Sequence, residues 1–409
     1  MIIDNLNIFG KRLMTVRFII KNLLKQPKNL MKKRILFVIF IWFYLYYKSR
    51  KRKVKKVFKR TAVNKDIMAN LQTIINEYKP TFYLPIPFLQ ILRSAIHSWK
   101  SCEFIHEIMV LPDGGEIMLD WYPKQPTTDR TDKPIVLFVP GLCGNKKSHY
   151  LNDLACYVDD MGWTIVSVNR RGFGLHKLNT PTFIPKDEVE DLEYLINRFR
   201  KIYPSNNIYL LGVSAGANFS VRYLGQCGKE DSIKASVAIS NPFSIGKISF
   251  TMKYNKLARL YSGFMAKDMQ DLFRYHKDCP HFRENVKQVG MDVGKFEKKL
   301  KKKTTCWKVD KFFTSKLGNF NHVLEYYHNI SSEHVISDIK IPTLFIQNQE
   351  DPICLKEMIP VENIYRNQNT ILLLTERGGH IEYFSGWKMD YWGFKTALYY
   401  FNLFEEKSK

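Results

Sequence analysis

Apolar runs of five or six residues recur through the middle and the end of the chain, separated by stretches with helical periodicity. Six runs stand out: 134–139, 163–168, 208–213, 235–240, 343–347 and 370–375. A strand that is apolar at nearly every position is buried on both faces, which is typical of a parallel sheet covered by crossover helices. The pattern therefore predicts an α/β fold with a mostly parallel sheet and helices on both faces.

Two segments depart from this alternation. Residues 109–121 have the pattern of two short strands around the turn Asp113-Gly114-Gly115, which is a hairpin signal. Residues from about 243 to 337 are helical in pattern, aromatic and rich in lysine. We expect this insertion to form a helical lid over the functional site; peripheral helices without that role are the alternative.

Near the N-terminus, residues 35–47 are apolar or aromatic without a charge, between basic residues on both sides. Thirteen helical residues span only about 20 Å against a hydrocarbon core of about 30 Å, which favours an interfacial or signal-like segment. However, nine Leu, Ile, Phe or Val residues favour insertion by several kcal/mol, and flanking lysines can snorkel. We therefore predict an N-terminal membrane-anchor helix, with a single transmembrane span over 35–47.

The basic flank after this run, residues 48–60, is richer than the one before it, which would keep the following domain cytosolic. A glycan at the sequon Asn329-Ile330-Ser331 would instead place that domain in a lumen. The expected location is a membrane, such as the endoplasmic reticulum or another endomembrane. The predicted parts of the chain are a basic N-terminal segment (1–34), the anchor (35–47), a basic linker (48–77) and a catalytic domain (78–409).

The charge balance narrows the choice of partners. The chain of 409 residues carries 63 Lys and Arg against 39 Asp and Glu, a net charge of +24. Such an excess suggests a polyanionic partner, either nucleic acid or an anionic membrane. The basic runs flank an apolar stretch and show no nucleic-acid motif with interleaved aromatic residues, so we expect a membrane and no nucleic acid.

The cysteines indicate neither a disulfide framework nor a zinc site. They are odd in number and show no C-x-x-C spacing: Cys102, Cys143, Cys156, Cys227, Cys279, Cys306 and Cys354. Reduced thiols in or facing the cytosol are the simplest interpretation. We expect no cofactor and no metal ion.

One motif carries specific chemistry. The apolar run 208–213 leads into Gly212-Val213-Ser214-Ala215-Gly216 and then into a helical stretch. A serine at such a strand-to-helix turn is typical of a nucleophile elbow, in which the two glycines make room for the tight turn. Ser214 is therefore the candidate nucleophile.

A serine nucleophile needs a base and a group that orients the base, and both follow Ser214 in the expected order. Asp351 comes just after the run 343–347, and His380 follows Gly378-Gly379 after the run 370–375. Both would lie in loops at the carboxyl ends of strands, where open α/β sheets place their sites. Glu350 is an alternative, but Asp351 is favoured because of its position in the loop, directly before Pro352.

Backbone amides are expected to stabilise the oxyanion of an acyl intermediate. One candidate is the amide of Ala215, directly after the nucleophile. The other is the amide of Leu142, in the loop after the run 134–139. Cys143 lies in the same loop, but it has no basic partner nearby in sequence and the serine elbow makes it redundant as a nucleophile.

With these motifs in place, the sequence resembles an α/β-hydrolase family that includes animal single-pass membrane lipases and phospholipases, and yeast medium-chain ester synthase/hydrolases. Individually the matching motifs are weak, but their order and spacing from about residue 78 to 400 are specific. They include Asp113-Gly114-Gly115, Pro140-Gly141-Leu142, Asn169-Arg170-Arg171-Gly172-Phe173-Gly174, the serine elbow, Asn241-Pro242-Phe243, Asp351-Pro352 and Gly378-Gly379-His380. The sequence departs from the family pattern at Pro87-Phe88, where Gly-His is common, and at Ile381-Glu382.

The resemblance implies an α/β-hydrolase fold, a membrane anchor and hydrolysis of carboxylic esters in lipids. It also implies the roles of nucleophile for Ser214, acid for Asp351 and base for His380. The predicted function is a membrane-anchored serine esterase, lipase or phospholipase acting on acylglycerols or phospholipids. An acyltransferase using the same acyl-enzyme and a non-catalytic membrane scaffold are the alternatives.

Overall fold

The computed structural model describes residues 28–49, 53–94, 101–123, 133–145, 148–174, 176–185, 188–300 and 304–406. Most of the predicted basic N-terminal segment and residues 50–52 of the predicted linker lie outside these ranges. The chain divides into two compact units, Met1–Arg50 and Lys51–Lys409, which are considered separately below.

The first unit contains helix α2 (Lys28–Ser49), which exposes apolar side chains such as Ile35, Phe37 and Phe40. Within the described part of the chain, no helix is both long enough and apolar enough to cross a membrane. The single span predicted over residues 35–47 is therefore not supported. The physical reason is its length, because the uncharged run ends after thirteen residues at basic residues on either side.

The second unit is built on a nine-stranded sheet in the order β1-β9-β8-β7-β6-β4-β5-β3-β2. Six neighbouring strands, from β9 through β5, run parallel, while β1, β3 and β2 pair antiparallel at the edges. The strands are β1 (Val54–Phe58), β2 (Ile105–Val110), β3 (Glu116–Tyr122), β4 (Ile135–Val139), β5 (Thr164–Asn169), β6 (Ile208–Val213), β7 (Ala235–Ile239), β8 (Thr343–Asn348) and β9 (Thr370–Thr375).

All six predicted parallel strands are present, displaced by at most one residue at their ends, and the predicted hairpin is β2–β3. Successive strand residues point to opposite faces, and both faces are covered. In β4, Ile135, Leu137 and Val139 belong to one core, and Val136 and Phe138 to the other. A strand buried on both sides must be apolar throughout, as these runs are.

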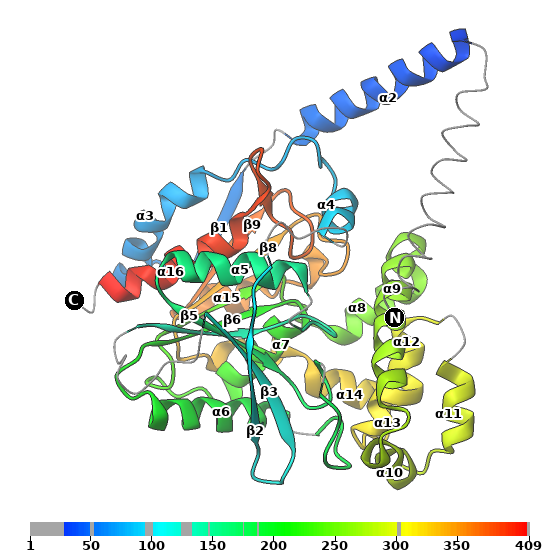
Figure 1. Cartoon of the computed structure of the whole chain (residues 1–409). Coiled ribbons are helices and arrows are strands. Elements are labelled where there is room, and N and C mark those ends of the chain that lie inside the picture. Colours follow the sequence, from blue (N-terminus) through cyan, green and yellow to red (C-terminus); the bar gives the residue numbers. More distant parts are fainter. Residues whose placement is uncertain are drawn as a thin grey trace. The chain divides into compact units, whose positions relative to one another are not determined.

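Helices form a layer on each side of this sheet (Figure 1). One layer consists of α6 (Val189–Ile202), α7 (Ala215–Gln226) and α15 (Val361–Arg366). The other consists of α3 (Ala62–Asn76), α5 (His149–Asp160) and α16 (Trp392–Glu406). The short helix α4 (Pro87–Ser94) and the two-residue strands β10 (Phe384–Ser385) and β11 (Asp390–Tyr391) complete this part of the unit.

The structure differs from the expected linker over residues 48–77. Residues 54–58 form β1, which pairs with β9 through five residues, and α3 packs against α16. Thr61 starts α3, because its Oγ1 accepts a hydrogen bond from the Asn64 amide at 3.1 Å. Residues 53–77 are therefore an integral part of the second unit rather than a linker.

A group of helices is inserted between β7 and β8, in the region where the sequence predicts an insertion (Figure 1). Together with Leu178 and Phe183 from the loop after β5, they enclose a small apolar core that includes Phe273, Phe282, Phe296 and Phe313. The inserted elements include α8 (Ile245–Tyr254), α9 (Lys256–His276), α10 (Pro280–Gln288), α11 (Val293–Leu300), α12 (Cys306–Val309), a π-helix (Asp310–Thr314), α13 (Ser315–Leu317) and α14 (Val323–Ile330).

Candidate active site

Ser214 lies at the turn between β6 and α7, in a strained backbone conformation with φ 52° and ψ −124°. The glycines on either side are required by close packing. A Cβ on Gly216 would be 2.2 Å from the Val139 carbonyl oxygen, and a Cβ on Gly212 would be 2.7 Å from the Ala217 Cα. The sequence Gly-x-Ser-x-Gly therefore allows a turn that holds the serine above the end of the sheet.

The structure brings Ser214 together with His380 and Asp351, which come from the loops after β9 and β8. The His380 Nε2 is 2.7 Å from the Ser214 Oγ, and its Nδ1 is 2.8 Å from the Asp351 Oδ2. All three residues are buried. This is the geometry in which an imidazole can take a proton from the serine while a carboxylate orients the ring.

Asp351, rather than Glu350, faces the histidine. The Asp351 Oδ1 accepts hydrogen bonds from the amides of Ile353 at 2.8 Å and Cys354 at 2.9 Å, which fix the carboxylate. The neighbouring Glu350 points elsewhere and pairs with Arg377 at 2.5 Å. The following proline and turn thus direct only one of the two adjacent carboxylates into the site.

Two carboxylates, those of Asp351 and Glu382, lie next to His380. Burial lowers the pKa of this histidine, but the charge and hydrogen bond of Asp351 and the charge of Glu382 outweigh burial and raise it above 6.5. The Glu382 Oε2 accepts hydrogen bonds from the backbone amides of His380 at 3.0 Å and Ile381 at 3.1 Å. Glu382, one of the departures from the family pattern, therefore acts on both the position and the pKa of His380.

Sequence reasoning missed several residues that hold this loop. The Ser240 hydroxyl, at the end of β7, donates to the carbonyl of His380 and lies 3.0 Å from the Tyr383 hydroxyl. The Asn348 side chain, at the end of β8, donates to the Gly379 carbonyl at 2.6 Å. The usable signal was their position, because polar residues that end apolar strands lie at the same sheet edge as the site.

Leu142 and Ala215, the candidate oxyanion-hole residues, line the same cavity as Ser214. Ala215 is the first residue of α7, where unpaired amides and the helix dipole favour negative charge. The loop after β4 approaches the serine closely, since a Cβ on Gly141 would lie 3.4 Å from the Ser214 Cβ. The assignment of these two amides to an oxyanion stays a prediction.

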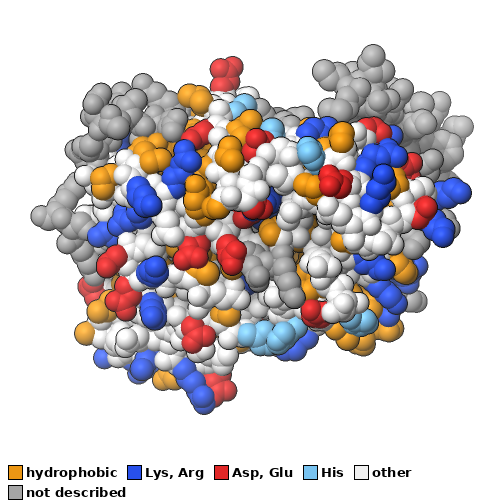
Figure 2. Space-filling view, turned by 90° about the horizontal axis from the view of Figure 1, so that it is seen from below, with side chains coloured by type: hydrophobic (Ala, Val, Ile, Leu, Met, Phe, Trp, Pro, Cys, Tyr) orange, Lys and Arg blue, Asp and Glu red, His pale blue; other side chains and the backbone are white. Residues whose placement is uncertain are grey.

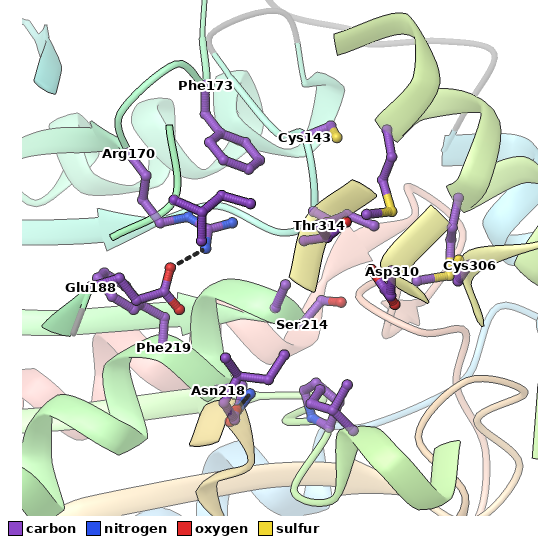
Figure 3. Close-up of a pocket in the computed structure, with 18 of the residues that line it drawn as sticks. Cys143, Arg170, Phe173, Glu188, Ser214, Asn218, Phe219, Cys306, Asp310 and Thr314 are labelled. Atoms are coloured by element: carbon purple, nitrogen blue, oxygen red, sulfur yellow. Dashed lines mark hydrogen bonds and ion pairs between the residues drawn. The ribbon is translucent and has the colours of Figure 1, made fainter. Parts of the chain in front are cut away.

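Ser214 opens into two cavities. The first, of about 160 Å³, is mainly apolar and extends between α7 and the inserted helices (Figure 3). Its wall includes Met252, Met265 and Met269. Figure 3 shows Ser214 between the Arg170–Glu188 ion pair and Asp310. The second cavity is more open, measures about 510 Å³ and is lined by His380 and the loop after β4.

Two ionic features of the first cavity were also missed by the sequence reasoning. Glu188 accepts from Arg170 at 3.2 Å and from the buried Arg222 at 2.7 Å. Burial raises the pKa of Asp310 to about 6, against the opposing effect of the Tyr327 hydroxyl, which donates to it at 2.8 Å. Arg170 belongs to a motif of the family resemblance, but no motif singled out Glu188, Arg222 or Asp310, because long-range packing brings them together.

Among the residues that the structure describes, Asp351, Cys354 and His380 are the one group of potential metal ligands, with ligand atoms within 4.8 Å of one another. Its ligand atoms are already engaged: Asp351 bonds His380 and two amides, and the Cys354 thiol donates to the Ser240 carbonyl at 3.2 Å. Burial and the charge of Asp351 raise the pKa of that thiol, which opposes metal binding as thiolate. The cluster suits proton transfer better than metal binding.

Several known proteins resemble this chain in sequence. The family described as alpha/beta hydrolase fold matches residues 134–292. A human (Homo sapiens) protein named phospholipase ABHD3 is 28% identical over 299 residues, covering 72% of this chain and 70% of the relative. A monoacylglycerol lipase from Saccharomyces cerevisiae is 27% identical over 265 residues, which cover 64% of this chain and 58% of the lipase.

Among solved structures, the esterase Pf2001 from Pyrococcus furiosus shares 17% identity and a TM-score of 0.46, covering 74% of this chain and 91% of that one. The sheet order and the sequence relatives agree with the family predicted from the motifs. The chain is therefore similar in sequence to α/β hydrolases, among them a phospholipase and a monoacylglycerol lipase, in agreement with the resemblance of its motifs.

Proposed function

We propose that this protein is a membrane-associated serine hydrolase that cleaves carboxylic esters of lipids, with Ser214 as nucleophile, His380 as general base and Asp351 as orienting acid. Carboxylic ester hydrolysis is the enzyme class that its relatives share. The observation that carries the proposal is the hydrogen-bonded chain from Asp351 through His380 to Ser214, which ends at a mainly apolar cavity.

In the proposed reaction, the Ser214 Oγ attacks the ester carbonyl carbon while the His380 Nε2 takes the serine proton. The oxyanion of the tetrahedral intermediate accepts hydrogen bonds from the amides of Leu142 and Ala215, each worth about 3 kcal/mol. The intermediate collapses, the alcohol leaves with the proton from His380, and an acyl ester on Ser214 remains. Water then repeats the attack with the same base and releases the fatty acid.

The cavities support a lipid substrate with the acyl chain and the alcohol on different sides of Ser214. The smaller cavity has an apolar, methionine-containing wall, which suits a flexible hydrocarbon chain. The more open one contains His380, where the leaving alcohol needs a proton. By analogy with the named relatives, a phospholipase and a monoacylglycerol lipase, we propose phospholipids or acylglycerols as the substrate class.

Membrane association is part of the proposal. It is supported by α2, whose apolar side chains are exposed between basic residues, and by the net charge of +24. We also propose that residues 78–409 include the catalytic machinery and that the helices between about 243 and 337 act as its lid. The cavity wall favours that role, since α8 and α9 both contribute to it.

A fluorophosphonate probe tests the nucleophile directly, because it forms a covalent bond only with an activated serine. We expect the wild type to be labelled and Ser214→Ala to be unlabelled, with ester hydrolysis reduced by about 10⁴-fold or more. Ser220→Ala, a buried serine on the next turn of α7, is the matched control and should retain labelling. Labelling that persists in Ser214→Ala would contradict the proposal.

Acyl transfer to an alcohol is the second candidate. The observation that favours it is the open cavity beside Ser214 and His380, which could admit an alcohol in place of water. Incubation of the enzyme and a lipid ester with and without an alcohol separates the two reactions. Fatty acid as the main product in both cases supports hydrolysis, whereas a new ester formed in preference to acid supports transfer.

A further inference from the structure

Helices α8 and α9 carry a set of large apolar side chains on their solvent side. Phe250 and Tyr254 on α8 are 57% and 63% exposed, and Leu260 and Phe264 on α9 are both 61% exposed. Each pair is four residues apart, so its members lie on one face of their helix. The rings of Phe250 and Tyr254 also contact each other, with centroids 4.6 Å apart.

The charge of the same segment has one sign. Residues 245–266 contain four basic residues and no aspartate or glutamate; the basic residues are Lys247, Lys253, Lys256 and Arg259. Lys247 contacts Glu333 at 2.9 Å, and the Lys253 ammonium lies 5.0 Å from the Tyr254 ring centroid. Aromatic and leucine side chains beside lysines and arginines are the pattern of a helix lying in a membrane interface.

The opposite side of these two helices faces the candidate active site. Ile248 and Met252 on α8, and Met265 and Met269 on α9, line the cavity that contains Ser214. Burial, together with the nearby charges of Asp351 and Glu382, raises the pKa of Tyr261 on α9. The exposed residues and the cavity are therefore separated by the thickness of one helix, about 10 Å.

Single exposed apolar residues are normal on a soluble surface, but four within residues 245–266, a range that contains no aspartate or glutamate, form a group that needs an explanation. We propose that this surface, formed by Phe250, Tyr254, Leu260 and Phe264 and called the docking face, inserts into the interface of an anionic lipid bilayer. Its apolar side chains contact the acyl region while Lys247, Lys253 and Arg259 meet the headgroups. This contact is made by the catalytic unit itself and is distinct from α2.

The docking face extends the proposed function, because it would bring a lipid ester next to the wall of the acyl cavity. Docking itself does not require catalysis, so it can be measured in full-length Ser214→Ala. Local measurement is needed because α2 also binds lipid under the proposed function. Hydrogen–deuterium exchange gives that local readout, peptide by peptide.

We expect vesicles of phosphatidylcholine with phosphatidylserine to slow exchange in peptides from residues 245–266, and vesicles of phosphatidylcholine alone to slow it less. The double variant Leu260→Ser, Phe264→Ser should lose this protection while the rest of the unit exchanges as before. Leu324→Ser is the matched control, since Leu324 is 57% exposed on α14 and lies outside the docking face. Equal protection in the double variant and the parent would overturn the proposal.

Kinetics give a second readout. With a lipid ester embedded in anionic vesicles, the double variant should lose about tenfold or more in kcat/KM, whereas a dispersed short-chain ester should be hydrolysed within about twofold of wild type. Leu324→Ser should match wild type on both substrates. Protection that depends on protein concentration without vesicles would instead identify a second copy of the chain as the occupant. If neither substrate is hydrolysed by wild type but vesicle protection persists, docking stands and the proposed function fails.

Discussion

At the scale of single residues, the site depends on positions where only one side chain fits. Ser214 has a positive φ, and its neighbour Gly216 has no space for a Cβ beside the Val139 and Pro140 carbonyls. The same loop cluster holds two carboxylates near one imidazole, with Asp351 at the ring and Glu382 at the backbone. Substitutions at these positions should therefore change stability, activity or pH dependence more than substitutions at ordinary surface positions.

Gly216→Ala should destabilise the protein and reduce activity together. Its Cβ would be 2.2 Å from a carbonyl oxygen, so strand β4 or the turn must shift, at a cost of about 2 kcal/mol or more in the free energy of unfolding. Chemical denaturation and ester hydrolysis measure the two effects. Gly263→Ala is the control, because a Cβ there meets nothing within 4 Å and alanine favours the helix by up to about 1 kcal/mol.

Glu382→Gln should shift the pH dependence of kcat/KM. General-base catalysis needs neutral His380, so its raised pKa places the acid limb of the profile above pH 6.5. Glutamine keeps an oxygen for the amides of His380 and Ile381 but removes the charge, so the limb should move to lower pH. Glu350→Gln is the control, because Glu350 pairs with Arg377 away from the ring. An unchanged limb in Glu382→Gln would show that its charge does not act on the base.

At the scale of elements, the edge strand β1 shows why residues 48–77 are misassigned from sequence. The run Val54-Lys55-Lys56-Val57-Phe58 has three apolar residues and two lysines, which is a pattern suited to an edge strand rather than to the centre of a sheet. Its lysines resemble the basic run before it, so composition suggests a linker. Pairing with β9, which the sequence does not encode locally, makes the segment part of the sheet.

Truncation tests this role. A chain starting at residue 53 should keep the stability of the second unit, whereas one starting at residue 61 loses β1 and leaves β9 as an open edge. We expect the shorter chain to unfold several degrees lower and to aggregate, because an apolar, unpaired strand edge is exposed. Thermal unfolding and light scattering measure this. Equal melting temperatures for the two chains would contradict a structural role for β1.

At the scale of the whole molecule, the positive charge is distributed unevenly along the chain. The first sixty residues contain 18 basic residues and one acidic residue, so the remaining 349 residues contain 45 basic against 38 acidic. Figure 2 agrees with this for the face it shows, where Lys and Arg are interspersed with Asp and Glu. The excess charge is therefore concentrated in the first sixty residues, around the apolar run and β1, rather than spread along the rest of the chain.

Membrane binding by the full chain should accordingly depend on salt. Raising ionic strength from about 0.05 to about 0.5 M shortens the screening length to a few Å and should weaken binding to anionic vesicles by about tenfold or more. Binding should not vanish, because apolar contacts are not screened. Co-sedimentation at several salt concentrations measures both the electrostatic and the apolar contribution to binding. Salt-independent binding would show that the basic N-terminal residues do not contact headgroups.

Much of the central fold could be predicted from the sequence. Strands buried on both faces must be apolar throughout, so the six parallel strands appear as runs that need no knowledge of their partners. The Ser214 elbow is also local, since two glycines and a serine suffice to recognise the turn. The contacts of Ser240, Glu382 and Asp310 could not be predicted in this way, because they join segments distant in sequence or depend on how a loop folds back.

The sequence by itself determined the fold class, the order of the three candidate catalytic residues and the presence of an inserted helical region, because these follow from local periodicity and chain order. Only the tertiary structure decided that Asp351 rather than Glu350 faces His380, that β1 belongs to the sheet, and which faces of α8 and α9 meet the cavity and the solvent. These features depend on distances between residues far apart in the chain, and such distances are set by packing of the whole unit.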